Sequence, residues 1–117
     1  MDAKELGRKG EALARRYYEK NGYTVLEMNY RTRMGEVDVI AQKGGLYVFC
    51  EVKARSGGPY APREAVTAAK RRRVMLAAQH YVAVQLGREA EMRFDVAEVI
   101  WQEGNFLFRC IENAFSF

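Results

Sequence analysis

The sequence predicts a single-domain α/β protein with one mixed β-sheet flanked by helices, and three observations lead to this fold class. The chain has 117 residues, the usual size of one domain. Its hydrophobic fraction is 49%, so it can bury one modest core. Segments with a helical spacing of apolar residues are interspersed with short runs of β-branched and aromatic residues. No linker or internal repeat divides the chain, and we treat residues 1–117 as one domain.

The first part of the chain predicts one helix followed by three strands. Asp2 is a suitable helix cap, and Asn21-Gly22 is a typical helix end. The strand-like runs that follow have short connections, so these strands should be antiparallel. The apolar residues expected to form the buried stripe of the helix are Leu6, Gly10, Leu13 and Tyr17. The predicted elements are a helix over residues 3–21 and strands over 23–30, 35–42 and 46–54.

The second part of the chain predicts a long helix and two further strands. A flexible loop over residues 56–62 follows the third strand. Pro62 suits the first turn of the helix, with Glu64 close behind it, and Gly87 ends the helix after Leu86. This helix is a crossover, so the third and fourth strands should be parallel. The last strands are predicted over 92–101 and 106–111, which completes the order αβββαββ.

The second and third strands should form a hairpin whose apolar residues match across the pair. Gly44-Gly45 can form a two-residue turn, a type that allows positive φ at both positions. Side chains alternate across each strand, so every second residue shares a face. With this turn, Cys50 points into the core and away from Glu51. The matched apolar pairs are then Val37 with Val52, Val39 with Cys50, and Ala41 with Val48.

The same register gathers charged side chains on the other face of the hairpin. Asp38 lies opposite Glu51, and Glu36 lies opposite Lys53, with paired Cβ atoms about 4.5–5.5 Å apart. Facing carboxylates are unfavourable unless a cation or a proton lies between them. A hard ion such as Mg²⁺ binds one or two carboxylates, and a neighbouring ammonium can orient water or stabilise charge on phosphorus.

Two alternatives stay open for this charged face. Half-solvated strands commonly carry charges on their wet face, and Glu36 with Lys53 would then be an ordinary surface ion pair of small worth. A register slip by two residues would keep the faces but separate Asp38 from Glu51.

These residues resemble the signature of the PD-(D/E)XK nuclease superfamily. GEVDVIA (35–41) is followed after a short gap by VFCEVKAR (48–55). More closely, the chain resembles the YraN-like family of small bacterial proteins, and the likeness runs almost end to end. Val37 stands where the name of the motif has proline. The matching segments are GRKGEALA, NYRTRMGEVDVIA, FCEVKAR, AVTAAKRRR and RFDVAEVI, which begin at residues 7, 29, 49, 65 and 93.

The resemblance implies a restriction-endonuclease-like fold and roles for five residues. Asp38 and Glu51 would bind Mg²⁺ or Mn²⁺, and the carbonyl of Val52 would be a further ligand. Lys53 would be the catalytic lysine. Glu11, on the first helix, would be an additional acid of the site; without the resemblance, a solvated helix glutamate explains it as well. The expected products carry a 5′-phosphate, and a homodimer is an expectation because small resolvase-like nucleases often pair to cut two strands.

The distribution of charge favours a polyanionic partner. The net charge is +4, and residues 1–73 hold 16 Lys/Arg against 9 Asp/Glu, whereas residues 74–117 hold 3 against 6. Ordinary solvated helix faces explain the charge alone equally well. Lys70 points inward or along the sheet, as a phosphate or carboxylate partner or as a snorkelling lysine. Tyr60 could stack on a base. The residues expected to contact nucleic acid are Arg31, Arg33, Arg55, Lys70, Arg71, Arg72 and Arg73.

The sequence therefore predicts a metal-dependent endonuclease, a hydrolase that cleaves DNA phosphodiester bonds, with branched or repair intermediates as candidate substrates. One alternative is a nucleic-acid-binding module of a repair complex that cleaves little. Another is an assembly protein whose acids pair with lysines. The N-terminus has no signal-peptide pattern and no apolar run approaches the roughly 18 residues of a membrane span. With only Cys50 and Cys110 and no CxxC pattern, we expect the cytoplasm.

Overall fold

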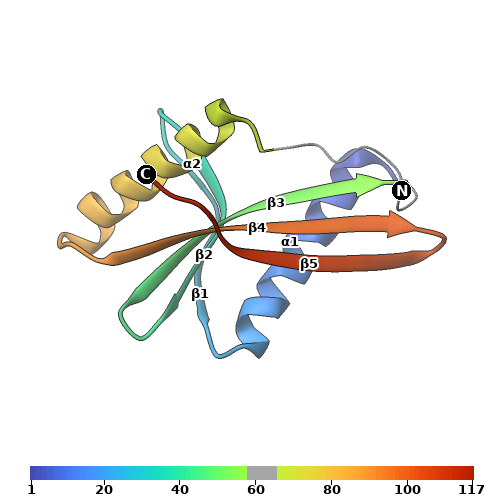
Figure 1. Cartoon of the computed structure of the whole chain (residues 1–117), viewed down its shortest axis with the longest axis horizontal. Helices are drawn as coiled ribbons and strands as arrows, with labels where there is room; N and C mark the ends of the chain where they lie inside the picture. The colour runs from blue at the N-terminus through green and yellow to red at the C-terminus, as the bar shows by residue number, and fades with distance from the viewer. Residues whose placement is uncertain (58–65) are drawn as a thin grey trace.

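The computed structural model describes residues 1–57 and 66–117, which form one five-stranded sheet with a helix on each face (Figure 1). The order of the elements confirms the predicted αβββαββ arrangement. A short π-helical segment, η1, continues the second helix. The elements are α1 (Ala3–Lys20), β1 (Thr24–Arg31), β2 (Glu36–Lys43), β3 (Leu46–Ser56), α2 (Ala68–His80), η1 (Tyr81–Leu86), β4 (Glu91–Gln102) and β5 (Asn105–Phe115).

The sheet has the strand order β1-β2-β3-β4-β5 and the pairing that the sequence predicts. β1, β2 and β3 are antiparallel, β3 and β4 are parallel, and β4 and β5 are antiparallel. The core on the α1 side consists of Ala14, Tyr18, Val39, Ala41, Val48, Cys50 and Ala97. The core on the α2 side is larger and includes Val37, Ile40, Phe49, Val74, Ala77, Tyr81, Phe94 and Phe115.

Helix α1 begins at the predicted cap, where the Asp2 carboxylate accepts a hydrogen bond of 2.8 Å from the Glu5 N–H. Its buried stripe differs from the prediction in its second half. Leu6 and Gly10 are buried as expected, but Ala14 and Tyr18 are buried in place of Leu13 and Tyr17. At Gly10 the helix lies so close to the sheet that an added Cβ would be 3.2 Å from the Cβ of Ala54. The next residue, Glu11, reaches β1, where its side chain accepts a hydrogen bond from Asn29.

Helix α2 begins later than predicted. Its first residue is Ala68, because the Thr67 side chain accepts a hydrogen bond from the Lys70 N–H and caps the helix there. Residues 66 and 67 are not helical, so a helix from Pro62 is wrong. Pro62 and Glu64 themselves, with Tyr60 and most of the predicted loop, lie outside the described residues.

The end of this helix matches the prediction, but its last turn changes pitch. The chain is α-helical to His80, forms η1, and ends at Gly87 with φ 65°. The wider π turn shifts the helical phase, and Val84 within it is 60% exposed. Val74, Ala77 and Tyr81, which precede it on the same helix, are buried.

The β2–β3 hairpin has the predicted register only over its first half. The ladder runs from Lys43 opposite Leu46 to Val39 opposite Cys50. Only the first glycine of the turn, Gly44, has positive φ (58°). Beyond Val39 the strands no longer pair, so the predicted pairs of Val37 with Val52, Asp38 with Glu51 and Glu36 with Lys53 do not form as ladder pairs.

The alternation of faces along β2 breaks where the β2–β3 ladder ends. Val37 belongs to the α2-side core, whereas Val39 lies in the α1-side core, so the alternation of faces breaks at Asp38. On β1, Met28 pairs with Val39 and Tyr30 with Val37, which puts Asn29 opposite Asp38. Asn29 has φ 55°, a conformation that Asn tolerates better than most residues.

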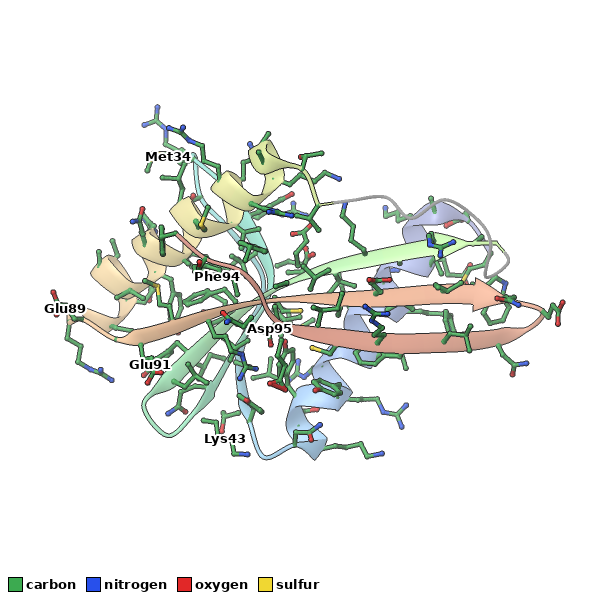
Figure 2. All side chains as sticks on the ribbon, viewed as in Figure 1. Met34, Lys43, Glu89, Glu91, Phe94 and Asp95 are labelled. Atoms are coloured by element: carbon green, nitrogen blue, oxygen red, sulfur yellow. The ribbon has the colours of Figure 1, made fainter. Side chains whose placement is uncertain are left out.

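The tip of the β1–β2 hairpin packs directly on the backbone of α2. A Cβ added to Gly35 would overlap the carbonyl group of Arg73, so only glycine fits at this position. Figure 2 shows the neighbouring Met34 beside α2, at the end of the hairpin. The hairpin and the helix are thereby fixed against one another.

Among the described helices, none combines the length and the hydrophobicity that crossing a membrane requires.

Candidate active site

The candidate site lies where β2 and β3 separate, and Asp38 spans the opening. Its Oδ2 atom accepts a hydrogen bond of 2.7 Å from the Val52 N–H. The N–H and C=O groups of one strand residue point to the same side of the strand. The Val52 carbonyl is therefore directed toward β2 as well, on the side where the ladder has ended. This places a carboxylate and a backbone carbonyl at the same opening.

Asp38 is held in a setting that favours its protonated form. Burial raises its pKa from 3.8 to about 6, and the hydrogen bond from Val52 opposes this rise. The carboxylates of Glu11 and Glu36 raise the pKa further, while a hydrogen bond with the Glu51 side chain lowers it. The side chain of Asp38 therefore meets that of Glu51 although the two residues are not ladder partners.

Glu51 is the second acid of the pair, and two lysines face it. Burial raises its pKa from 4.5 to about 7, and the charge of Asp38 adds to the rise. Lys53 and Lys70 act in the opposite direction and lower the pKa. Lys70 therefore reaches the site carboxylates from α2, which answers the question that the sequence left open for this side chain.

Glu11, on α1, lies close enough to Asp38 for its charge to act on that carboxyl. It is half-buried, and its Oε1 accepts a hydrogen bond of 3.1 Å from Asn29 Nδ2. Sequence reasoning missed Asn29. The signal that could have found it is the β1–β2 register, which places this asparagine opposite Asp38.

The donor set of the site fits a hard divalent ion that keeps most of its water. Asp38, Glu51 and the Val52 carbonyl supply oxygen ligands, and two neighbouring acids with raised pKa values form a space where a cation is favourable. Within residues 1–57 and 66–117, no group of three or more His, Cys, Asp or Glu side chains is arranged to hold a metal ion. Mg²⁺ is commonly bound by one or two carboxylates, with water and phosphate oxygens as its other ligands.

The predicted basic residues fall into three groups around the site. Arg31 and Arg33 are exposed near the hairpin tip, where with His80 they line an open hollow, and Arg31 pairs with Glu36 at 3.5 Å. Arg55 and Arg71 line a cavity next to Lys53. Arg72 and Arg73 are exposed on α2. Arg31 and Glu36 are partners across β1–β2, which brings the two side chains together.

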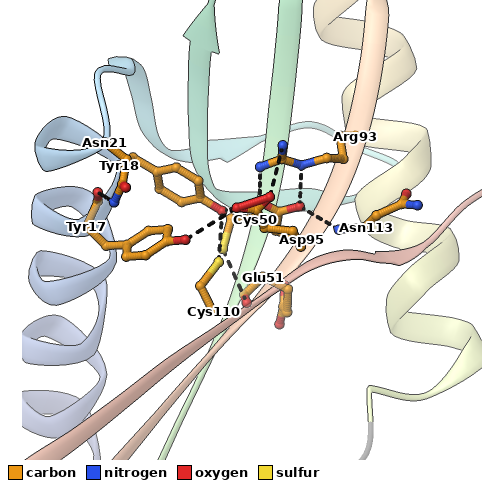
Figure 3. Close-up of polar contacts among 10 residues, drawn as sticks. Tyr17, Tyr18, Asn21, Cys50, Glu51, Arg93, Asp95, Cys110 and Asn113 are labelled. Atoms are coloured by element: carbon orange, nitrogen blue, oxygen red, sulfur yellow. Dashed lines mark hydrogen bonds and ion pairs between the residues drawn. The ribbon is translucent and has the colours of Figure 1, made fainter.

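A second acidic group lies on the α1 face of the sheet and has a structural role (Figure 3). Asp95 is fully buried and accepts hydrogen bonds from Arg93 Nε at 2.9 Å and Arg93 Nη2 at 2.8 Å. The Tyr18 hydroxyl donates to it at 2.6 Å and the Asn113 N–H at 3.0 Å. Arg93 and Asp95 therefore form an ion pair within the core. Figure 2 shows Asp95 near the centre of the molecule.

These features define a class, a small α/β protein with a mixed sheet and an acid–lysine site at the opening of a β-hairpin. A family model described as uncharacterised protein family UPF0102 matches residues 10–99. The chain belongs to this family, which confirms the YraN-like resemblance of its motifs.

Curated relatives named UPF0102 protein support this assignment over nearly the whole chain. The relative from Alkaliphilus metalliredigens is 46% identical over 99 residues, which is 84% of this chain and 87% of the relative. The relative from Chlorobium chlorochromatii is 50% identical, over 81% of this chain and 74% of the relative. The relative from Symbiobacterium thermophilum is 46% identical over 97% of this chain and 98% of its own.

Proposed function

We propose that this protein is a metal-dependent endonuclease that acts on DNA in the cytoplasm. The observation that carries the proposal is the pair formed by Asp38 and Glu51, two half-buried acids that meet in the opening of the β2–β3 hairpin with Lys53 and Lys70 beside them. A purely structural ion-pair cluster would neutralise its acids, whereas this one leaves their pKa values raised. Such an arrangement is typical of sites that bind a cation together with an anionic substrate.

The acids would hold the metal, and the metal would supply activation of water and neutralisation of charge on the phosphate. Asp38 and Glu51 would contribute carboxylate oxygens, and Val52 its carbonyl. The Val52 N–H bond to Asp38 keeps that carboxylate oriented toward the opening. Glu11 adds a negative charge on the α1 side, where Asn29 fixes its direction.

The lysines would act on the phosphate and on the attacking water. Lys53 lies two residues after Glu51 on the same face of β3, and its charge reaches that carboxylate. An ammonium there can orient water for in-line attack and stabilise the negative charge that develops on phosphorus. The new bond from water to phosphorus forms as the bond to the 3′ oxygen breaks, which leaves a 5′-phosphate.

Cleavage of a defined substrate panel tests the proposal. Branched, flapped, single-stranded and duplex DNA are incubated with Mg²⁺ or Mn²⁺ and resolved on denaturing gels. We expect Lys53→Ala to slow cleavage by about 10²–10⁴-fold, the usual worth of a positioned acid–base group. Arg16→Gln, an exposed arginine of α1, is the charge-matched control and should cut at the wild-type rate. If Glu51→Ala and Lys53→Ala preparations cut as well as wild type, the activity is a contaminant and the proposal fails.

The exposed arginines favour one alternative, a nucleic-acid-binding module that retains the site but cleaves little. Calorimetric titration with Mg²⁺ and Mn²⁺ of wild type and Asp38→Ala, beside the cleavage assay, separates the functions. Site-dependent metal uptake with cleavage supports the endonuclease, and uptake with DNA binding but no cleavage supports the module. The homodimer expected from the resemblance stays a prediction.

A further inference from the structure

A cavity of about 340 Å³ lies next to the candidate active site, on the α2 face of the sheet. Lys53 lines it and so connects it to the acid pair, while its other walls come from β4, β5 and the residues that precede and begin α2. Its volume is within the range of small-molecule sites in proteins. Nothing in the catalytic arrangement described above requires this space.

The cavity combines an apolar wall with a basic rim. Ile111, Ala114 and Phe115, at the end of β5, form the apolar part. Lys53, Arg55 and Arg71 provide three positive charges, and Glu98 provides one negative charge. An apolar wall beside several cations is the combination that a nucleotide requires, because its base has apolar faces and its phosphate is anionic.

The two arginines of this rim differ in their contacts. Arg71 donates a hydrogen bond of 3.1 Å from Nε to the Val66 carbonyl, and its guanidinium carbon lies 5.8 Å from the centre of the Phe115 ring. The Nη1 atom of Arg55 is buried and has no hydrogen-bond partner among the described residues. Buried guanidinium groups are normally satisfied, and a phosphate oxygen in the cavity would supply the acceptor.

We propose that this cavity holds one unpaired nucleotide beside the cleaved phosphate, with its base against the β5 wall and its phosphate on Arg55 and Arg71. A base inside a duplex is stacked and paired, and it cannot enter a cavity of this kind without leaving the helix. The preferred substrate is therefore a strand with unpaired nucleotides, such as a single strand, a flap or a branch point. The position of the nucleotide next to the cleaved bond rests on the proposed function, but the nucleotide site itself does not.

Binding measured without cleavage tests the proposal. Fluorescence anisotropy in EDTA compares a single-stranded 12-mer with its duplex for wild type, Arg71→Gln, Ala114→Leu and the control Arg16→Gln. Ala114→Leu fills the cavity without changing charge, and Ala114 is half-buried, so the larger side chain has room to adjust. We expect Ala114→Leu to weaken single-strand binding about tenfold, the worth of one stacked base, and to leave duplex binding unchanged. Arg71→Gln should weaken it about threefold or more, and Arg16→Gln should match wild type.

A measurement on the wild-type protein keeps the test independent of any folding defect in the variants. Titration with deoxyadenosine 5′-monophosphate, followed by NMR, should shift the methyl signals of Ile111 and Ala114. Unshifted methyl signals, or a folded Ala114→Leu protein that binds the single strand as tightly as wild type, would overturn the proposal. Cavity-dependent binding without any cleavage would support the nucleotide site and count against the endonuclease. Cleavage together with binding that does not depend on the cavity would support the endonuclease and count against the nucleotide site.

Discussion

Asp95 and the pair formed by Asp38 and Glu51 lie at two places in the same sheet, and their surroundings differ. Asp95, on the α1 face, is fully buried, and four hydrogen bonds from Arg93, Tyr18 and Asn113 satisfy it. Asp38 and Glu51, at the β2–β3 opening, remain only half-buried, meet one another, and have raised pKa values. Asp95 is thus fully paired, whereas Lys53 and Lys70 only partly offset the charges of Asp38 and Glu51.

The difference supports the proposed division between an acid that serves the fold and acids that serve chemistry. A buried carboxylate with a bidentate arginine and two further donors has no capacity left for a ligand. Two adjoining acids that a pair of lysines only partly compensates carry a cost to stability, and such costs are typical of functional sites. The following experiments test this contrast in order of decreasing expected effect.

Replacing Asp95 should give the largest loss of stability. Asp95→Ala leaves the Arg93 guanidinium and the Tyr18 hydroxyl without their buried partner, and we expect the free energy of unfolding to fall by about 3–5 kcal/mol. Urea unfolding measures the change. The matched control is Glu112→Gln, which removes the exposed partner of Arg93 and should cost less than about 1 kcal/mol. An Asp95→Ala protein with the wild-type midpoint would contradict a structural role for this acid.

The acid pair should make the protein less stable as the pH rises. The pKa values of Asp38 and Glu51 in the folded state, about 6 and about 7, exceed their ordinary values of 3.8 and 4.5. Between roughly pH 4 and 7 the folded state therefore binds more protons than the unfolded state, and stability falls as the pH increases through this window. In EDTA, we expect wild type to lose about 1–3 kcal/mol between pH 5 and 8 relative to Glu51→Gln.

Urea unfolding of wild type and Glu51→Gln in one buffer series measures the pH effect. Groups that titrate elsewhere in the chain affect both proteins equally, so they cancel in the difference between the two free energies of unfolding. Equal slopes for wild type and Glu51→Gln would show that the two acids are not strained. The same series with Mg²⁺ should reduce the wild-type slope, because a cation stabilises the ionised pair.

Asn29 should give the smallest effect, and two substitutions separate its two roles. Asn29→Ala places an ordinary side chain at φ 55° and should lower the free energy of unfolding by about 1 kcal/mol. Asn29→Gly relieves the backbone and should unfold near wild type, but it also removes the hydrogen bond to Glu11. Thermal unfolding measures the effect on the backbone, and Mg²⁺ titration measures the effect on the site. If Glu11 belongs to the site, both variants should bind Mg²⁺ more weakly than wild type. Mg²⁺ binding at the wild-type level by both variants would show that Glu11 does not contribute to the metal site.

The sequence predicts the order and pairing of the elements because those depend on local signals. β-branched runs, the Gly44-Gly45 turn and a crossover helix suffice for the strand order and for the first half of the hairpin register. The break in face alternation at Asp38 has a long-range cause. It depends on the positive φ of Asn29 and on the hydrogen bond from the Val52 N–H to the Asp38 carboxylate. The late start of α2 at Thr67 and the exposure of Val84 depend on a cap and on a π turn that the apolar pattern does not reveal.

The site shows the same division between local and long-range causes. Strand alternation places Glu51 and Lys53 on one face, and the structure agrees. The approach of Lys70 to Glu51 was one of several alternatives, because helical periodicity gives the direction of a long side chain but not its reach. Glu98 was missed as a wall of the cavity, since its place follows from the parallel register that sets it beside Lys53.

The absence of a side chain at Gly35 has a mechanical consequence. The backbone of Gly35 packs directly against the backbone of Arg73. Substitution of side chains at this contact therefore cannot adjust the spacing between β2, which carries Asp38, and α2, which carries Lys70. A methyl group at residue 35 would push α2 away from the hairpin. Lys70 would then move away from Asp38 and Glu51, whereas Lys53, on β3, would stay in place.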